Sequence, residues 1–239
     1  MTTDTSAAII DPEEKRRIRW IVFSVAFAVF MVRLDSYIVV ISLPTLARYF
    51  QVGTSEASWV ILSYLMVVTG STLIFGKLAD RIGLKKIFLW GYGLFTLGSL
   101  LCGLSPTIYL LDAASCLQGV GGAMMITSGM ASIPHYLPKN IAGWAFGICS
   151  LANSLGIMVG APLGGVITCF LSWHWIFLIN VPVGILAIVI VKRSLPADQN
   201  RPPLAERRPF DVSGSILSFV GFTALVFALS RCEDEGWQS

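Results

Sequence analysis

The sequence predicts an all-α polytopic membrane protein, in which a six-helix transmembrane bundle is followed by a seventh transmembrane helix. Three observations support this fold class. The chain is 55% hydrophobic and only 13% charged, whereas about one residue in four is charged in a soluble domain. Apolar runs long enough to cross a ~30 Å hydrocarbon core recur along the chain. The basic residues between these runs alternate in density, as the loops of a multi-pass protein do.

The apolar runs define the predicted elements in chain order. The seven spans are expected at residues 18–43, 57–75, 87–104, 108–133, 141–171, 175–191 and 212–229. Pro44 is expected to mark the exit of the first span, because proline interrupts helical hydrogen bonding. The chain therefore divides into a polar tail at 1–17, a bundle at 18–191, a basic linker at 192–211, a seventh transmembrane helix at 212–231 and a short tail at 232–239.

The distribution of Lys and Arg predicts the orientation. With the N-terminus inside, the inside segments hold fourteen of the seventeen basic residues, and the outside segments hold only Arg48 and Arg231. Because basic residues accumulate on the cytoplasmic side, we expect the N-terminal tail and the linker in the cytoplasm, in a plasma or inner membrane. A cleavable signal is not expected, because the first apolar run is too long and lacks a small-residue cleavage site.

Composition also argues against other classes of protein. The net charge of +3 arises from loops between spans, so nucleic acid is not an expected partner. The five cysteines lack metal-ligand spacing, and His135 and His174 are expected on opposite sides of the membrane, so no metal is expected. Neither a nucleophile–base pair nor a phosphate-binding glycine loop stands out, which argues against an enzyme and against a bound cofactor.

A charged, glycine-punctuated segment separates the second and third apolar runs. It is expected to be a tight cytoplasmic loop that Arg81, Lys85 and Lys86 hold inside. Asp80 is the one acidic residue of this segment and could lie at the N-terminus of a neighbouring helix, where the dipole favours negative charge. The residues alone leave open whether this segment only sets topology or also has a function. Its candidate functional residues are Gly76, Asp80, Arg81, Gly83, Lys85 and Lys86.

Three ionisable residues lie inside predicted spans: Arg33, Asp35 and Asp112. Each costs about 2.5–3.5 kcal/mol at a helix centre, so a role is the default expectation. A carboxyl group held away from water suits reversible protonation, and Asp35 is the candidate proton-binding group; the alternative is a structural Asp bonded to a neighbouring helix. Because Arg33 and Asp35 are two residues apart, they point to different sides of their helix. Arg33 therefore needs another partner or must snorkel, and Asp112 is the candidate partner if the first and fourth helices touch. The alternative is that Asp112 lies hydrated near the outer interface.

The fifth span carries glycines at a spacing of four, Gly156, Gly160 and Gly164. Such a stripe lets another helix approach closely, and Pro162 between them is expected to bend the helix. Ordinary small-residue packing is the alternative interpretation of this span. Polar and aromatic residues that could line a substrate cavity are Tyr37, Tyr64, Gln118 and Asn153.

Several of these stretches resemble motifs of the major facilitator superfamily. Residues 76–86 resemble the signature loop between its second and third helices, which implies a latch between conformations. Residues 34–44 resemble the first-helix motif of the fourteen-helix drug:proton antiporter branch (the EmrB/QacA type), in which the acid is implied in proton coupling. Residues 153–165, which end in Gly164 and Gly165, resemble the antiporter motif, with the proline displaced by one position.

Three further matches belong to the same resemblance. Residues 118–123 resemble a fourth-helix motif whose buried arginine is replaced here by Ser115, and Arg33 is a hypothetical substitute for that charge. Residues 173–184 and 210–214 resemble the starts of the sixth and seventh helices of the branch, so the resemblance runs from about residue 17 to residue 239.

The resemblance implies a secondary transporter that exports small lipophilic or cationic compounds by proton antiport with alternating access, driven by a proton gradient. Its expected partners are the lipid bilayer and a small-molecule substrate. Because the resemblance covers only the N-terminal half of that branch, we also expect a second half-transporter chain or a homodimer. The alternative is a truncated or split half-transporter that acts as a non-transporting scaffold or partner subunit.

Overall fold

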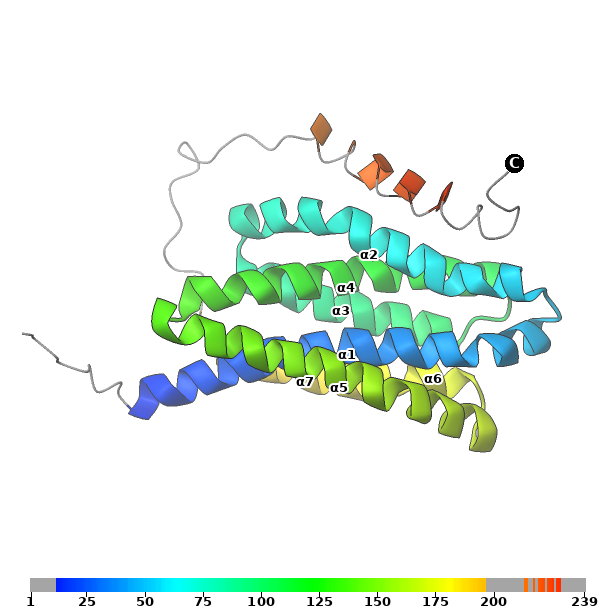
Figure 1. Cartoon of the computed structure of the whole chain (residues 1–239), viewed down its shortest axis with the longest axis horizontal. Coiled ribbons are helices and arrows are strands. Elements are labelled where there is room, and N and C mark those ends of the chain that lie inside the picture. The colour runs from blue at the N-terminus through cyan, green and yellow to red at the C-terminus, as the bar shows by residue number, and fades with distance from the viewer. Residues whose placement is uncertain are drawn as a thin grey trace, which may run out of the picture.

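The computed structural model describes residues 12–196 and, beyond them, residues 213, 214, 217, 219–221, 223–225, 227 and 228. These residues are almost entirely helical and include no strand (Figure 1). The helices are α1 (Pro12–Phe50), α2 (Thr54–Ile82), α3 (Leu84–Gly103), α4 (Ile108–Tyr136), α5 (Lys139–Phe170), α6 (His174–Leu178) and α7 (Asn180–Ser194). Residues 197–211 of the predicted linker, the outer tail and residues 1–11 lie outside the described residues.

Six segments within the described residues are long and apolar enough to cross a membrane. Five are α1 to α5, and the sixth is His174–Ser194, which contains α6 and α7. Ile179 joins these two helices with φ −60° and ψ −30°, which are ordinary helical angles, so the pair forms one spanning segment. The structure thus confirms the predicted fold class, an all-α polytopic membrane protein.

The predicted end of the first span is wrong. α1 continues through Pro44 and ends at Phe50. Proline removes one backbone donor, but membrane helices tolerate it where nearby groups restore the lost bonding. The Nε of Arg48 donates to the carbonyl of Pro44 over 3.2 Å, which is a contact within the continuing helix and does not replace the bond that the proline removes. The apolar run before Pro44 therefore indicated the helix correctly, while the helix ends about 9 Å beyond Pro44 along its axis.

Glycines set the packing between neighbouring helices. A Cβ added at Gly121 of α4 would lie 2.3 Å from the backbone nitrogen of Phe95 of α3, and one at Gly98 would lie 2.7 Å from Gln118. On the other side of α4, a Cβ at Gly119 would lie 2.9 Å from the carbonyl of Tyr64 in α2. α4 thus lies between α2 and α3, as Figure 1 also shows.

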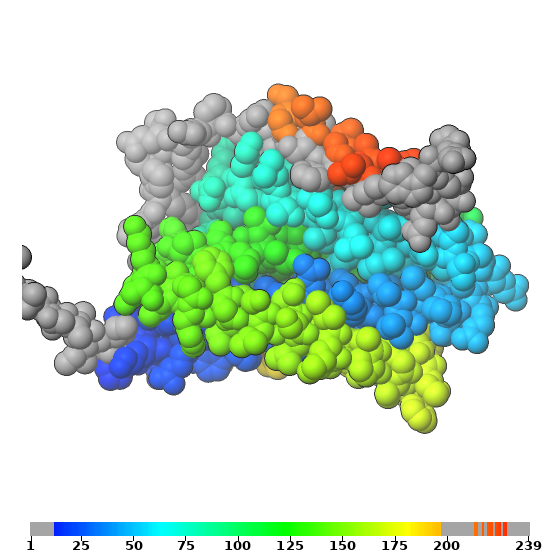
Figure 2. All heavy atoms as spheres, viewed as in Figure 1, coloured from blue at the N-terminus to red at the C-terminus, as the bar shows by residue number. Residues whose placement is uncertain are grey.

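α1 and α5 form the other side of the bundle. Figure 2 shows a face on which α2, α4, α1 and α5 lie side by side at the surface. Few residues of α5 are buried, and its exposed apolar side chains include Leu151, Leu155, Met158 and Phe170. The core lies instead around α3, where the side chains of Phe88, Tyr92 and Phe95 are fully buried. The α5 surface is suited to lipid or to another apolar bundle.

One end of the bundle gathers the ends of five helices. In one apolar cluster, Ile18 of α1 packs with Ile133 of α4 and Ala145 of α5. At the same end, the Nζ of Lys85 in α3 donates to the backbone carbonyl of Lys192 in α7 over 2.9 Å. The helices therefore alternate in direction, and this end carries the clusters of basic residues. We call it the basic end.

The described residues of the predicted seventh span are helical and lie along α2. A Cβ added at Gly70 would be 2.7 Å from Cδ2 of Phe219, and the ring of Phe227 is 5.9 Å from that of Trp59. Because Phe219 meets the later residue of α2 and Phe227 the earlier one, the segment runs antiparallel to α2.

Candidate functional site

Asp35 occupies the interior of the bundle. Its side chain is only 2% exposed, although it lies on a helix that can span a membrane. The Nδ2 of Asn180, at the start of α7, donates to Oδ1 of Asp35 over 2.5 Å. The side-chain amide of Gln118 in α4 also lies within hydrogen-bonding reach. The acid is therefore held by amides from two other helices, and we call Asp35, Asn180 and Gln118 the carboxyl–amide cluster.

Gln118 extends this cluster to α3. Its Nε2 donates to Oγ of Ser99 over 2.7 Å, and Sγ of Cys102 lies 3.8 Å from its Oε1. Gln118 is 1% exposed, so its amide serves a packed polar network and not the wall of an open cavity. The prediction that Gln118 lines a cavity is not what the geometry of this conformation shows.

Tyr64 of α2 completes the surroundings of the acid. The side chain is 3% exposed and lies near Asp35 and Ser36, but among the residues that the structure describes its hydroxyl has no hydrogen-bond partner. A buried hydroxyl without a partner costs stability and calls for an explanation. The hydroxyl therefore keeps a donor and an acceptor that the described side chains around it do not use.

Arg33 and Asp35 lie on different sides of α1, as their spacing predicts. Arg33 is exposed while Asp35 is buried, and the Cβ of Arg33 faces Gly156 of α5. Tyr37, one turn further along, is half-buried and lies against Gly160 in the same way. Asn153 of α5 is half-buried too. Of the four predicted cavity residues, Tyr37 and Asn153 thus belong to the α1–α5 surface, while Tyr64 and Gln118 belong to the interior.

Arg33 and Asp112 form no ion pair within the described residues. Arg33 lies seventeen residues before the end of α1, about 25 Å along the helix axis. Asp112 lies four residues after the start of α4, about 6 Å from that helix end. The two helices touch, but the charges lie at different depths, and the predicted pair is wrong for this conformation.

Asp112 lies near the acidic Glu56 of α2, at the end of the bundle opposite the basic end. The hydroxyl of Tyr109 donates to Oε1 of Glu56 over 3.2 Å, while Oδ1 of Asp112 is buried and has no hydrogen-bond partner within the described part of the chain. Ser115, one turn further along α4, is buried with its Oγ 3.6 Å from Sγ of Cys102. Ser115 therefore faces α3 and stands apart from Arg33.

The glycine stripe of α5 lies directly on the backbone of α1. A Cβ added at Gly156, Gly160 or Gly164 would lie 2.8, 2.9 or 3.0 Å from the carbonyl oxygens of Phe30, Leu34 and Ile38. Gly165, the next residue, faces open space. Pro162 is exposed, and α5 continues past it without interruption. The stripe therefore brings α1 and α5 together next to Asp35.

The segment predicted as a loop between α2 and α3 is mostly helix, so that prediction is wrong in its extent. α2 runs to Ile82 and α3 begins at Leu84, which leaves Gly83 as the single residue between them. Gly76 is inside α2, half-buried beside Thr127. The reason is that the residues between the two glycines favour helix, with Ala79 buried on its inner face.

The charged residues of this segment surround Gly83. Lys85 donates to the backbone carbonyls of Lys192 and Leu195, so a positive charge meets the C-terminal end of α7, where the helix dipole favours it. Asp80, Arg81 and Lys86 are exposed. Asp80 forms no hydrogen bond with a helix N-terminus among the described residues, contrary to expectation.

We predict that Gly83→Ala destabilises the α2–α3 turn. Gly83 has φ 120° and ψ 143°, a conformation that a residue with a Cβ adopts only at a cost of about 1–3 kcal/mol. Gly93→Ala in α3 is the matched control, because a Cβ there meets nothing within 4 Å and alanine favours helix. Unfolding of the two variants in mixed micelles measures the difference. Equal stability of the two variants would contradict the prediction.

Sequence reasoning missed the role of Asn180. It lies 145 residues from Asp35 in the chain, and a single sequence does not show which helices meet. A usable signal was present, since Asn180 is a polar residue inside an apolar span, which indicates an interhelical partner. No group of three or more His, Cys, Asp or Glu residues that could hold a metal occurs among the described residues.

Comparisons with known proteins agree with this architecture. The family model described as Major Facilitator Superfamily matches residues 25–232. A protein of Escherichia coli O81 (strain ED1a) named "Putative multidrug resistance protein MdtD" is 38% identical over 219 residues, which are 92% of this chain and 45% of the relative. A protein of the same name from Escherichia fergusonii is 38% identical over 218 residues, 91% of this chain and 45% of the relative. The chain spans about half the length of the curated relatives it matches.

Proposed function

Because the chain belongs to the major facilitator superfamily, we propose that it forms the N-terminal bundle of a secondary transporter of the fourteen-helix drug:proton antiporter branch. The transporter would export small lipophilic or cationic compounds in exchange for protons, from a plasma or inner membrane, with the N-terminus in the cytoplasm. The name of the relatives, which refers to multidrug resistance, supports this substrate class.

The burial of Asp35 is the observation that carries this proposal. A carboxylate only accepts hydrogen bonds, whereas the protonated group also donates one. In the first state Asp35 accepts from the Nδ2 of Asn180, as in the structure. When Asp35 is protonated, the hydroxyl of its carboxyl group can donate to the amide oxygen of Asn180 or Gln118. Loading a proton therefore changes the link between α1, α4 and α7, which is what coupling of protons to helix movement requires.

The exposure of Arg33 supports a partner for this bundle. A charged side chain that faces lipid at mid-membrane costs about 2.5–3.5 kcal/mol, and Arg33 is exposed on α1. We infer that the surface with Arg33 and Tyr37 meets a water-filled cavity or a second bundle. Alternating access needs one bundle to move against another. The second bundle would be a separate half-transporter chain or another copy of this chain.

The exposed apolar side chains of α5 favour a second function. In this alternative the bundle serves as a membrane scaffold or partner subunit and does not transport. The exposed apolar side chains of α5 would then contact another membrane protein. The two functions differ in whether a proton gradient drives substrate movement through membranes that contain this chain.

We expect everted membrane vesicles that contain the chain and its second bundle to accumulate a fluorescent lipophilic cation when a proton gradient is present. A protonophore should abolish accumulation, because the gradient is the proposed energy source. Vesicles without the chain provide the background. Gradient-independent accumulation would exclude antiport, and no accumulation in the presence of a second bundle would favour the scaffold function.

A further inference from the structure

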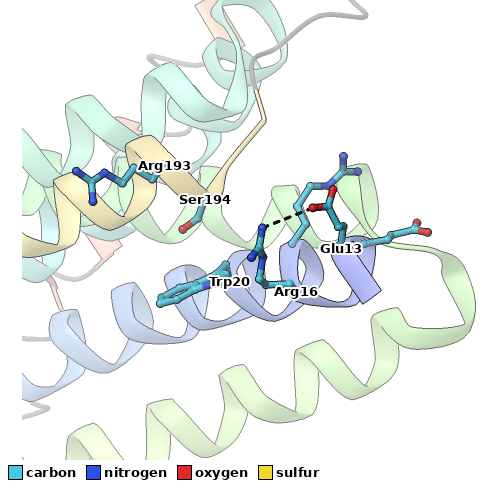
Figure 3. Close-up of a pocket in the computed structure, with 7 residues that line it drawn as sticks. Glu13, Arg16, Trp20, Arg193 and Ser194 are labelled. Carbon is cyan, nitrogen blue, oxygen red and sulfur yellow. Dashed lines mark ion pairs between the residues drawn. The ribbon is translucent and has the colours of Figure 1, made fainter. Parts of the chain in front are cut away.

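A groove opens between the two helix ends at the basic end of the bundle. One cavity of about 500 Å³ is lined by Glu13, Glu14, Arg16, Arg17, Trp20, Arg193 and Ser194. A second cavity of about 610 Å³ shares four of these residues and adds Leu186, Val189 and Ile190. The two cavities are therefore parts of one groove between the start of α1 and the end of α7 (Figure 3).

The groove is polar at its mouth and apolar along its length. Arg16 and Trp20 come from α1, and Arg193 and Ser194 from α7, as Figure 3 shows. Leu186 and Val189 continue along α7 towards the middle of the membrane and are 59% and 42% exposed. Trp20 is 47% exposed, and tryptophan at this depth is typical of the interface between headgroups and hydrocarbon.

The arginines at the mouth are available to an anion. NH2 of Arg16 is 4.0 Å from Oε1 of Glu13, and both side chains are largely exposed. A pair of this kind contributes at most about 1 kcal/mol, so a better ligand can replace it. Among the described residues, the charged side chains that line the apolar part are those of Arg16 and Arg193. Arginine pairs bind phosphate oxygens with bidentate geometry.

We propose that this groove binds an anionic phospholipid of the leaflet at the basic end, whose phosphate contacts Arg16 and Arg193 and whose acyl chain lies along Leu186, Val189 and Ile190. The charge and the apolar wall together favour this ligand, because a soluble phosphate leaves the wall exposed, whereas a zwitterionic lipid places its own cationic headgroup beside the arginines. Basic pockets between transmembrane helices bind such headgroups in other membrane proteins. The groove is separate from the carboxyl–amide cluster, so the inference does not rest on the proposed transport.

Native mass spectrometry of the full chain in detergent tests the proposal. Dioleoylphosphatidylglycerol and dioleoylphosphatidylcholine are the probes, since they share acyl chains and differ in charge. We expect tighter binding of phosphatidylglycerol. The double variant Arg16→Gln, Arg193→Gln should lose about fivefold in affinity for each arginine, and Leu186→Asn should weaken binding through the apolar wall.

The matched control is Arg19→Gln, Lys139→Gln, which removes two positive charges from the same end without touching the groove. It should bind phosphatidylglycerol as the parent does, and thermal unfolding checks that all variants are folded. Equal affinity for both lipids, or an equal loss in the control, would overturn the proposal. So would displacement of the lipid by millimolar inorganic phosphate, which indicates a simple anion site. If the double arginine variant lost a dimer of the chain and not a bound lipid, the groove would be assigned to a second copy of the chain, and the proposal would also be overturned.

Discussion

Asp35→Asn is expected to abolish proton-coupled exchange and to leave the bundle folded. Asparagine has the same shape, and its side-chain oxygen can still accept the hydrogen bond that Nδ2 of Asn180 donates. What it cannot do is bind and release a proton, so the coupled step is lost. The measurement is the change of internal pH when substrate is added to proteoliposomes that contain the chain and its second bundle.

Glu56→Gln is the matched control for this prediction. It also replaces a carboxylate by an amide, and the amide oxygen can still accept from the hydroxyl of Tyr109. Because Glu56 lies at the end of the bundle opposite the basic end, we expect coupled exchange to persist in this variant. Unchanged exchange in Asp35→Asn would remove the acid from the mechanism, and equal losses in both variants would show that the assay reports charge alone.

The sequence singled out Asp35 but not the side-chain amides that contact it. The cost of a charge in a span made Asp35 conspicuous, since that cost depends only on hydropathy along the chain. The amides of Asn180 and Gln118 reach it from other helices, and contacts between distant helices depend on packing. The expected pair of Arg33 with Asp112 failed for the same reason, because depth along a helix is known only once its ends are known.

Glycine patterns were more informative than charges. The spacing of Gly156, Gly160 and Gly164 predicted close approach of another helix, and the structure shows that α1 is that helix. At the α2–α3 turn, the glycines indicated a loop, but only Gly83 has a backbone conformation that needs glycine. A regular spacing specifies a surface, whereas an isolated glycine specifies a turn only where the backbone has a positive φ.

Gly160→Val is expected to destabilise the bundle by about 1–3 kcal/mol, the usual cost of extra atoms in a packed core. A Cβ at this position would lie 2.9 Å from both the carbonyl oxygen of Leu34 and the Cβ of Tyr37. The first of these is backbone and cannot rotate away, so α1 and α5 must separate. The free energy of unfolding in mixed micelles measures the effect.

Gly165→Val is the matched control, because it makes the same substitution in the same helix where nothing lies within 4 Å of the added Cβ. Both substitutions replace glycine by valine in α5, so they change helix propensity alike. The difference in unfolding free energy between the two variants therefore isolates the contact with α1. Equal destabilisation would show that the stripe is not the packing surface.

The contact at Gly160 is also expected to affect function, since Leu34, which it touches, immediately precedes Asp35. A shift of α1 at this point would move the carboxyl group away from Asn180, which lies on α7 and not on α5. We therefore expect Gly160→Val, but not Gly165→Val, to weaken coupled exchange in protein that remains folded.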